Sequence, residues 1–184
     1  MNKKPFGDNA TGYWQRGYSV IPTEPAEKRP AKEIQSWSSY CHNLPAASRR
    51  EGWLRSYSGN GIGLLLGKEL EPGYRIGAVD VDDDRLVAVA EKILGNCICG
   101  KRGQNGATFF VRAKIEKGVS TTSFRKIDIL IGGKMTMIPP TIHPTTQAPY
   151  EWIGAPLLGN SIPARRPDVR EHVWQFLHAS GLVV

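Results

Sequence analysis

"RIGAVDVDDDRLVAVAEKILG", residues 75–95, contains both of the patterns from which the fold class can be predicted. Its first part, residues 75–82, alternates apolar residues with aspartates, as expected of a strand that turns one set of side chains into a core. Its second part, residues 84–94, places apolar residues at helical spacing and is followed by a glycine. The stretch therefore predicts a strand that leads directly into an amphipathic helix.

The same periodicities predict the other elements. Helices are expected at residues 8–16, around Trp37, at 49–57 and at 164–179. Further strands are expected at residues 17–23, 61–67, 107–113, 126–131, 134–140 and 148–154, the last one at a sheet edge. Gly132-Gly133 suits a primed turn and predicts a hairpin between residues 126–131 and 134–140. The fold class is therefore α+β, with a largely antiparallel sheet flanked by helices.

The length of 184 residues predicts a single domain. Within it we expect an N-terminal helix and strand module at 1–57, a central sheet at 58–154 and a C-terminal helix at 164–180. The abrupt "GLVV" end indicates a domain cut from a longer protein, although a natural terminus fits equally well.

Composition narrows the classes of partner. The formal net charge is +7, which favours a polyanion such as nucleic acid or nucleotide. No apolar run is long enough for a membrane span, and no apolar stretch follows the N-terminal lysines, so neither a membrane anchor nor a secretory leader is expected. Three cysteines are few and suit a reducing cytoplasm, and Cys97 and Cys99 are too close in sequence for a usual zinc site.

The acidic residues at the end of the predicted strand are candidates for a metal site. Asp80 and Asp82 project from one face of the strand, where two like charges repel unless a cation neutralises them. Mg²⁺ binds one or two carboxylates and completes its shell with water and phosphates. Alternatively the acids begin the next helix, which accounts for Asp83 and Asp84 but not for Asp80 inside the strand.

Two further residues stand out by their surroundings. Asp128 interrupts an apolar strand, so it either faces the same site or is a hydrogen-bonded edge residue. His143 precedes Pro144 in "MIPPTIHP" (137–144), which holds its backbone extended and mounts the imidazole rigidly. A structural role for His143 is the alternative to a role in the site.

"CGKRGQNGATFFVRA", residues 99–113, reads as a glycine-rich basic turn that enters an aromatic strand. Its glycines let the backbone approach a ligand, and Lys101 and Arg102 supply positive charge. The turn lacks the Lys-Ser/Thr ending of a Walker loop, so a solvated basic turn is the alternative.

The order of these motifs resembles the primase-polymerase (Prim-Pol) domains of the archaeo-eukaryotic primase superfamily, which occur in plasmid, phage and prophage replication proteins. The resemblance extends from "GYSVIPTEPAEKRPAKEIQSW" (17–37) through the DxD strand, the basic turn and the PPxxHP segment to "PYEWIG" (149–154). It implies the RRM-like catalytic core of that superfamily.

The resemblance also implies roles for individual residues. Asp80 and Asp82 match the first metal-binding motif of the family and Asp128 the third, and together they would hold catalytic Mg²⁺ or Mn²⁺. The second motif usually carries a histidine that binds the phosphates of the nucleotide. Here Ala107 and Thr108 occupy the matching strand, so Lys101 and Arg102 would take over that role. His143 matches a later element near the nucleotide.

We therefore expect a cytoplasmic, template-dependent DNA primase/polymerase. Its partners would be single-stranded DNA as template or primer, nucleoside triphosphates and a replicative helicase domain. One alternative is a replication-initiator domain that binds nucleotide or single-stranded DNA with little or no catalysis. A metal-dependent nuclease or relaxase is less consistent with the sequence, because a relaxase needs a His-x-His motif that is absent.

Overall fold

The strand predicted around the acidic residues lies at the centre of the structure and leads into the predicted helix. The computed structural model describes residues 4–95, 99–114, 122–124 and 126–158. β4 spans Tyr74–Val81 and α3 spans Asp84–Leu94, which confirms both predictions. β4 pairs with β6 (Ala107–Lys114) on one edge and with β8 (Ile127–Leu130) on the other, in both cases antiparallel.

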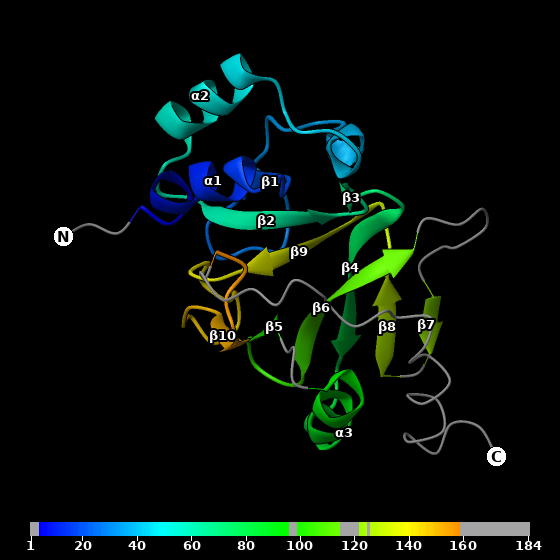
Figure 1. The fold of residues 1–184 in the computed structure, drawn as a ribbon. Helices are drawn as coiled ribbons and strands as arrows, with labels where there is room; N and C mark the ends of the chain where they lie inside the picture. Colours follow the sequence, from blue (N-terminus) through cyan, green and yellow to red (C-terminus); the bar gives the residue numbers. More distant parts are fainter. Residues whose placement is uncertain (1–3, 96–98, 115–121, 125, 159–184) are drawn as a thin grey trace.

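The strands form two antiparallel sheets (Figure 1). The larger sheet has seven strands in the order β10-β5-β6-β4-β8-β7, and β3 pairs with the first residues of β4. Its other strands are β3 (Glu69–Glu71), β5 (Cys99–Arg102), β7 (Thr122–Phe124) and β10 (Glu151–Gly154). The smaller sheet has the order β1-β2-β9 and consists of β1 (Val20–Thr23), β2 (Gly61–Leu66) and β9 (Lys134–Ile138). The α+β class with antiparallel pairing is confirmed, with two sheets in place of one.

Helices cover the two sheets at opposite ends of the molecule (Figure 1). The N-terminal helical elements are α1 (Pro5–Gln15), the 3-10 helix η1 (Trp37–Cys41) and α2 (Ala47–Ser56). α1 and η1 lie against the three-stranded sheet and α2 packs on α1, whereas α3 lies against the seven-stranded sheet. None of the helices in the described part of the chain is long and apolar enough to cross a membrane.

Alternate residues of β4 and β6 enter two separate cores. Val79 and Phe109 pack with α3 in one core. Ala78 and Phe110 pack on the opposite face with the N-terminal helices and the three-stranded sheet. Both faces of the central strands are therefore covered, which explains why residues 75–81 are so apolar.

The predicted hairpin through Gly132-Gly133 is wrong. β8 pairs with β4 and β7, whereas β9 pairs with β2 in the other sheet, so the glycine pair connects two sheets. An alternating pattern indicates that a strand has a buried face but does not specify its partner. β2 is buried at all six positions, and β9 supplies the neighbour that its apolar residues require.

Two other expectations concern the ends of the sheet and of the chain. The predicted edge strand is confirmed, because β10 is the terminal strand beside β5. Residues 99–102 form strand β5, which corrects the interpretation of this segment as a turn. The expected C-terminal helix at 164–180 lies outside the described residues.

Candidate active site

Four polar residues form one row across four neighbouring strands of the larger sheet. Asp80 on β4 is directly opposite Asp128 on β8 and also directly opposite Thr108 on β6. Thr108 is in turn opposite Lys101 on β5. Directly opposed residues of an antiparallel sheet have Cβ atoms about 4.5–5.5 Å apart and project from the same face. The fold therefore brings two predicted acids and one predicted base into a continuous line.

This row begins where one of the two cores ends. Ala78 lies two residues before Asp80 on β4, and Phe110 lies two residues after Thr108 on β6, so both project from the same sheet face as the row. Both belong to the core formed with the N-terminal helices. Asp80 is half-buried at the boundary, and Asp82 is exposed just beyond the end of β4. On this face of β4, the residue inside the core is thus apolar, and the next residue on the same face, where the sheet opens to solvent, is a carboxylate.

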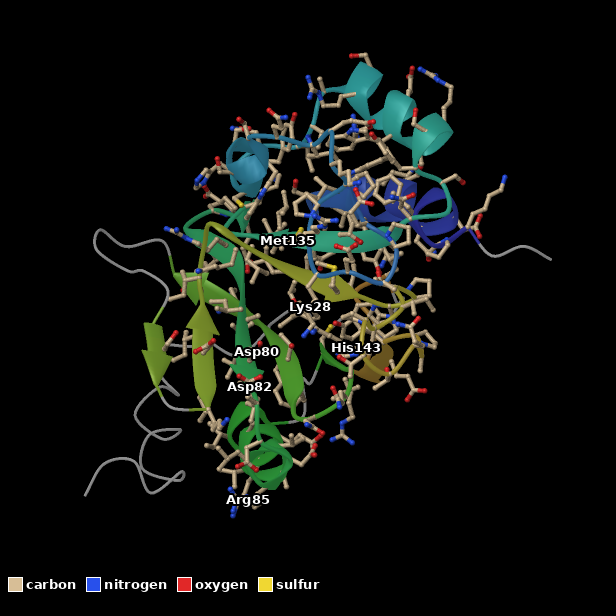
Figure 2. The ribbon with its side chains drawn as sticks, turned by 180° about the vertical axis from the view of Figure 1, so that it is seen from behind. Lys28, Asp80, Asp82, Arg85, Met135 and His143 are labelled. Atoms are coloured by element: carbon tan, nitrogen blue, oxygen red, sulfur yellow. The ribbon has the colours of Figure 1, made fainter. Side chains whose placement is uncertain are left out.

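The row borders an open cavity of about 240 Å³. The residues that line it are Lys28, Asp80, Asp82, Lys101, Gly103, Gln104, Asn105, Ala107, Thr108, His143, Thr145 and Tyr150. Four of the six residues singled out from the sequence are in this group. Asp128 and Arg102 are not among the lining residues, although Asp128 adjoins Asp80 across the strands. Figure 2 shows Asp80, Asp82, Lys28 and His143 gathered on this side of the molecule.

The separation of Lys101 from Arg102 follows from strand geometry. Successive side chains of a strand project from opposite faces, so Lys101 faces the cavity and Arg102 faces away from it. Lys101 is only 9% exposed, whereas Arg102 is exposed. A turn could have directed both charges toward a ligand, but β5 cannot.

Asp80 is oriented by a hydrogen bond from the neighbouring strand. The Thr108 hydroxyl donates to Asp80 Oδ1 over 2.5 Å. Among the described residues, no cationic side chain forms an ion pair with Asp80, Asp82 or Asp128. Opposed carboxylates without cationic partners destabilise a sheet, and their oxygens are the ligands that Mg²⁺ prefers.

The donor set fits a divalent cation that completes its coordination with water and phosphate oxygens. Within the described ranges, no three His, Cys, Asp or Glu side chains converge closely enough to hold an ion by themselves. The acids therefore form a row of neighbouring carboxylates, of which Asp80 and Asp82 reach the cavity.

The acids that follow Asp82 stabilise the corner of the site. Asp83 caps α3 by accepting the backbone N–H of Arg85 at 3.0 Å, which confirms its predicted role at the helix start. Asp84 Oδ1 accepts the backbone N–H of Gly106 at 3.0 Å and so ties the β5–β6 turn to α3. A side chain at Gly106, where φ is +65°, would collide with the Val81 carbonyl. The glycine is thus required by close approach to protein backbone.

Lys101 is buried and lies over an aromatic ring. Its ammonium lies 4.6 Å from the centre of the Tyr150 ring. Burial lowers the pKa of Lys101 to about 8; the Asp80 carboxylate opposes this shift, and Lys28 adds to it. Such a lysine gains most from an anion that replaces its lost hydration.

The imidazole of His143 is fixed by hydrogen bonds and by ring packing. Its Nδ1 accepts the backbone N–H groups of Thr145 at 3.2 Å and Thr146 at 3.3 Å. Its ring packs edge-on against Tyr150 with centroids 5.0 Å apart. Burial lowers the pKa of His143, and the charges of Lys28 and Lys101 act in the same direction. Because Nδ1 accepts these two hydrogen bonds, it carries no proton, which leaves the ring proton on Nε2 as a hydrogen-bond donor.

Lys28, Thr108 and Tyr150 also line the cavity, and none of them was identified from the sequence as a site residue. Lys28 lies in a polar, proline-rich loop that carries no periodic signal. Thr108 projects from the same sheet face as Asp80, but this follows only from the register of the two strands, which the sequence does not show. Tyr150 reaches the cavity because the chain between β9 and β10 folds back, with the Tyr150 N–H donating to the Thr141 carbonyl at 2.9 Å.

The chain was compared with known proteins. A search of curated proteins returned no match. Residues 10–169 match the family described as "Bifunctional DNA primase/polymerase, N-terminal" (Prim-Pol). This match spans most of the chain, and it includes every residue of the polar row and of the cavity. The chain therefore belongs to the Prim-Pol family.

Proposed function

We propose that the protein is a template-dependent DNA primase/polymerase that transfers nucleotides with the help of divalent cations. Membership of the Prim-Pol family suggests a primase/polymerase and implies DNA and nucleotides as substrates. The observation that carries the proposal is the polar row, which has carboxylates at one end and a buried lysine at the other. A nucleoside triphosphate needs both, because its α-phosphate reacts at metal ions while its other phosphates need cationic or hydrogen-bonding partners.

Asp80, Asp82 and Asp128 would hold the Mg²⁺ or Mn²⁺ ions. When bound, the ions would activate the attacking 3′-hydroxyl and neutralise charge on the phosphates. Thr108 keeps Asp80 in one orientation by occupying Oδ1, which leaves Oδ2 available. The residues thus supply anionic oxygens on neighbouring strand positions, and one of the carboxylates is already held in a fixed orientation.

Lys101 and His143 would bind the phosphates. Lys101 is desolvated and rigidly packed over Tyr150, so it can form a charge-assisted hydrogen bond with little loss of conformational freedom. His143 Nε2 adds a neutral N–H donor. Arg102, which was predicted for the same role, lies outside the cavity lining and is left for contacts elsewhere, such as a DNA strand.

Primer extension tests this function directly. Purified protein is incubated with a labelled primer–template, all four deoxynucleoside triphosphates and Mg²⁺ or Mn²⁺, and Asp80→Asn serves as the inactive control. We expect extension by the wild type that EDTA abolishes. Unextended primer under both metals, from folded protein that still binds deoxynucleotide or single-stranded DNA, would instead favour the initiator domain without catalysis.

A further inference from the structure

The loop that carries Lys28 is anchored to the smaller sheet by its backbone. The loop follows β1 and returns to it through a bridge between Thr23 and Pro30. Backbone hydrogen bonds close it, from Glu24 N–H to the Arg29 carbonyl and from Ala31 N–H to the Pro22 carbonyl, both at 3.0 Å. The loop is therefore positioned by the N-terminal part of the chain.

This loop brings Lys28 to the cavity of the other sheet. Lys28 is one of the cavity's lining residues, and Figure 2 shows it near Asp80 and His143, on the side of Asp80 away from Asp82. Its positive charge lowers the pKa of both Lys101 and His143. Lys28 thus acts electrostatically on the two residues to which phosphate binding is assigned.

The Lys28 ammonium has no anionic partner among the described residues. It is exposed, and no residue in the described part of the chain forms an ion pair with it. The neighbouring Arg29, in contrast, donates from Nη2 to Glu27 Oε1 at 3.2 Å. The like charges of Lys28 and Lys101 oppose each other at this end of the cavity, and an anion between them would offset that repulsion and could also accept from His143 Nε2. A multiply charged anion matches this arrangement best.

We propose that Lys28 binds the terminal phosphates of the incoming nucleoside triphosphate and thereby makes the site selective for triphosphates over monophosphates. The inference rests on the proposed function, which places the α-phosphate at the carboxylates. The phosphates beyond the α-phosphate then extend toward Lys101 and His143. Lys28, on a loop of the smaller sheet, lies at the same end of the cavity. A nucleoside monophosphate placed at the carboxylates lacks the phosphates that Lys28 would bind.

Nucleotide binding by variants tests the proposal. Calorimetric titrations with dATP, dADP and dAMP are carried out in Ca²⁺ for the wild type, Lys28→Gln, Lys28→Arg and Arg29→Gln. Arg29→Gln is the matched control, because it removes the same charge from the same loop. We expect Lys28→Gln to bind dATP about tenfold more weakly, as for loss of one charge-assisted hydrogen bond, and dAMP within twofold of the wild type. Lys28→Arg should restore much of the dATP affinity, and Arg29→Gln should resemble the wild type.

The outcomes separate this proposal from the proposed function. If wild-type protein binds dATP but Lys28→Gln binds it equally well, or weakens dATP and dAMP alike, the role of Lys28 is wrong while the function stands. If Lys28→Gln loses affinity for an oligo(dT) strand and keeps its affinity for dATP, Lys28 contacts the template instead and the proposal is overturned. If the wild type binds none of the three nucleotides, both proposals fall.

Discussion

The Thr108 hydroxyl donates a hydrogen bond to the Asp80 carboxylate across the β4–β6 pair, at 2.5 Å. The two residues are direct cross-strand neighbours, so the bond requires no bending of either strand. It fixes the orientation of a carboxylate that has no ion-pair partner among the described residues. Thr108 is therefore a positioning residue for the acid at the centre of the polar row.

Thr108→Val should weaken binding of divalent cations by roughly ten- to a hundredfold, as is typical when a partner that orients a metal ligand is removed. Valine preserves the shape of the side chain, so the free energy of unfolding should change little. Mn²⁺ titration followed by electron paramagnetic resonance measures the effect without turnover. Thr108→Ser, which keeps the hydroxyl, is the control, and equal Mn²⁺ affinity in the valine variant would exclude the positioning role.

Asp80→Ala, Asp82→Ala and Asp128→Ala should each abolish nucleotide incorporation in primer extension while leaving the fold intact. Removal of a carboxylate relieves repulsion, so the free energy of unfolding without metal should stay level or rise by up to about 1 kcal/mol for Asp128→Ala. Asp83→Ala is the control. It removes the N-cap of α3 and should lower the thermal midpoint while extension persists. A near-normal extension rate in any of the first three would contradict the three-carboxylate site.

His143→Ala should raise the KM for nucleotide by roughly three- to tenfold, because a neutral N–H donor contributes about 0.5–1.5 kcal/mol. An imidazolium would contribute more, but burial and two neighbouring ammonium groups keep the pKa of His143 low. Affinity for single-stranded DNA should hardly change. His42→Ala, at an exposed histidine, provides the matched control. A variant that unfolds, or that loses DNA binding alone, would assign His143 a structural or template role.

Lys101 should make folding stability depend on pH above neutrality. Its pKa is about 8 in the folded protein and ordinarily 10.5, so between these values the unfolded chain binds the extra proton. The free energy of unfolding should therefore rise as pH increases through this window, by roughly 3 kcal/mol over the whole interval. Denaturant titrations of wild type and Lys101→Met between about pH 7.5 and 9.5 isolate the contribution. Parallel curves for the two proteins would show that Lys101 titrates normally.

Much of the fold could be predicted from local patterns. The strand at Tyr74–Val81 and the helix at Asp84–Leu94 follow from periodicities of two and 3.6 residues and from an aspartate and a glycine at the helix ends. The partner of β9 could not be predicted, since Lys134–Ile138 has the same alternation whichever strand it joins. Short β5 was missed because two of its four residues are charged and one is glycine.

Site residues could be predicted from the sequence only where the residue type was unusual for the local pattern. Asp80 and Asp128 are acids in apolar strands, and His143 has a proline after it, so each stood out in the sequence. Lys28 and Thr108 are ordinary residues for a loop and a strand, and their importance depends on what the other sheet or strand places beside them. Arg102 illustrates the converse, because a charge that stands out in sequence is directed away from the cavity by the strand it lies in.

The pairing of β2 with β9 has a consequence for synthesis of the chain. β2 is finished at Leu66, but β9 is complete only at Ile138, and ribosomes add about 5–20 residues per second. For several seconds a nascent chain presents the apolar "GIGLLL" strand with one edge unpaired, which is a template for association with other chains. A fragment that stops before β9 would retain that open edge permanently, so we expect it to associate through β2.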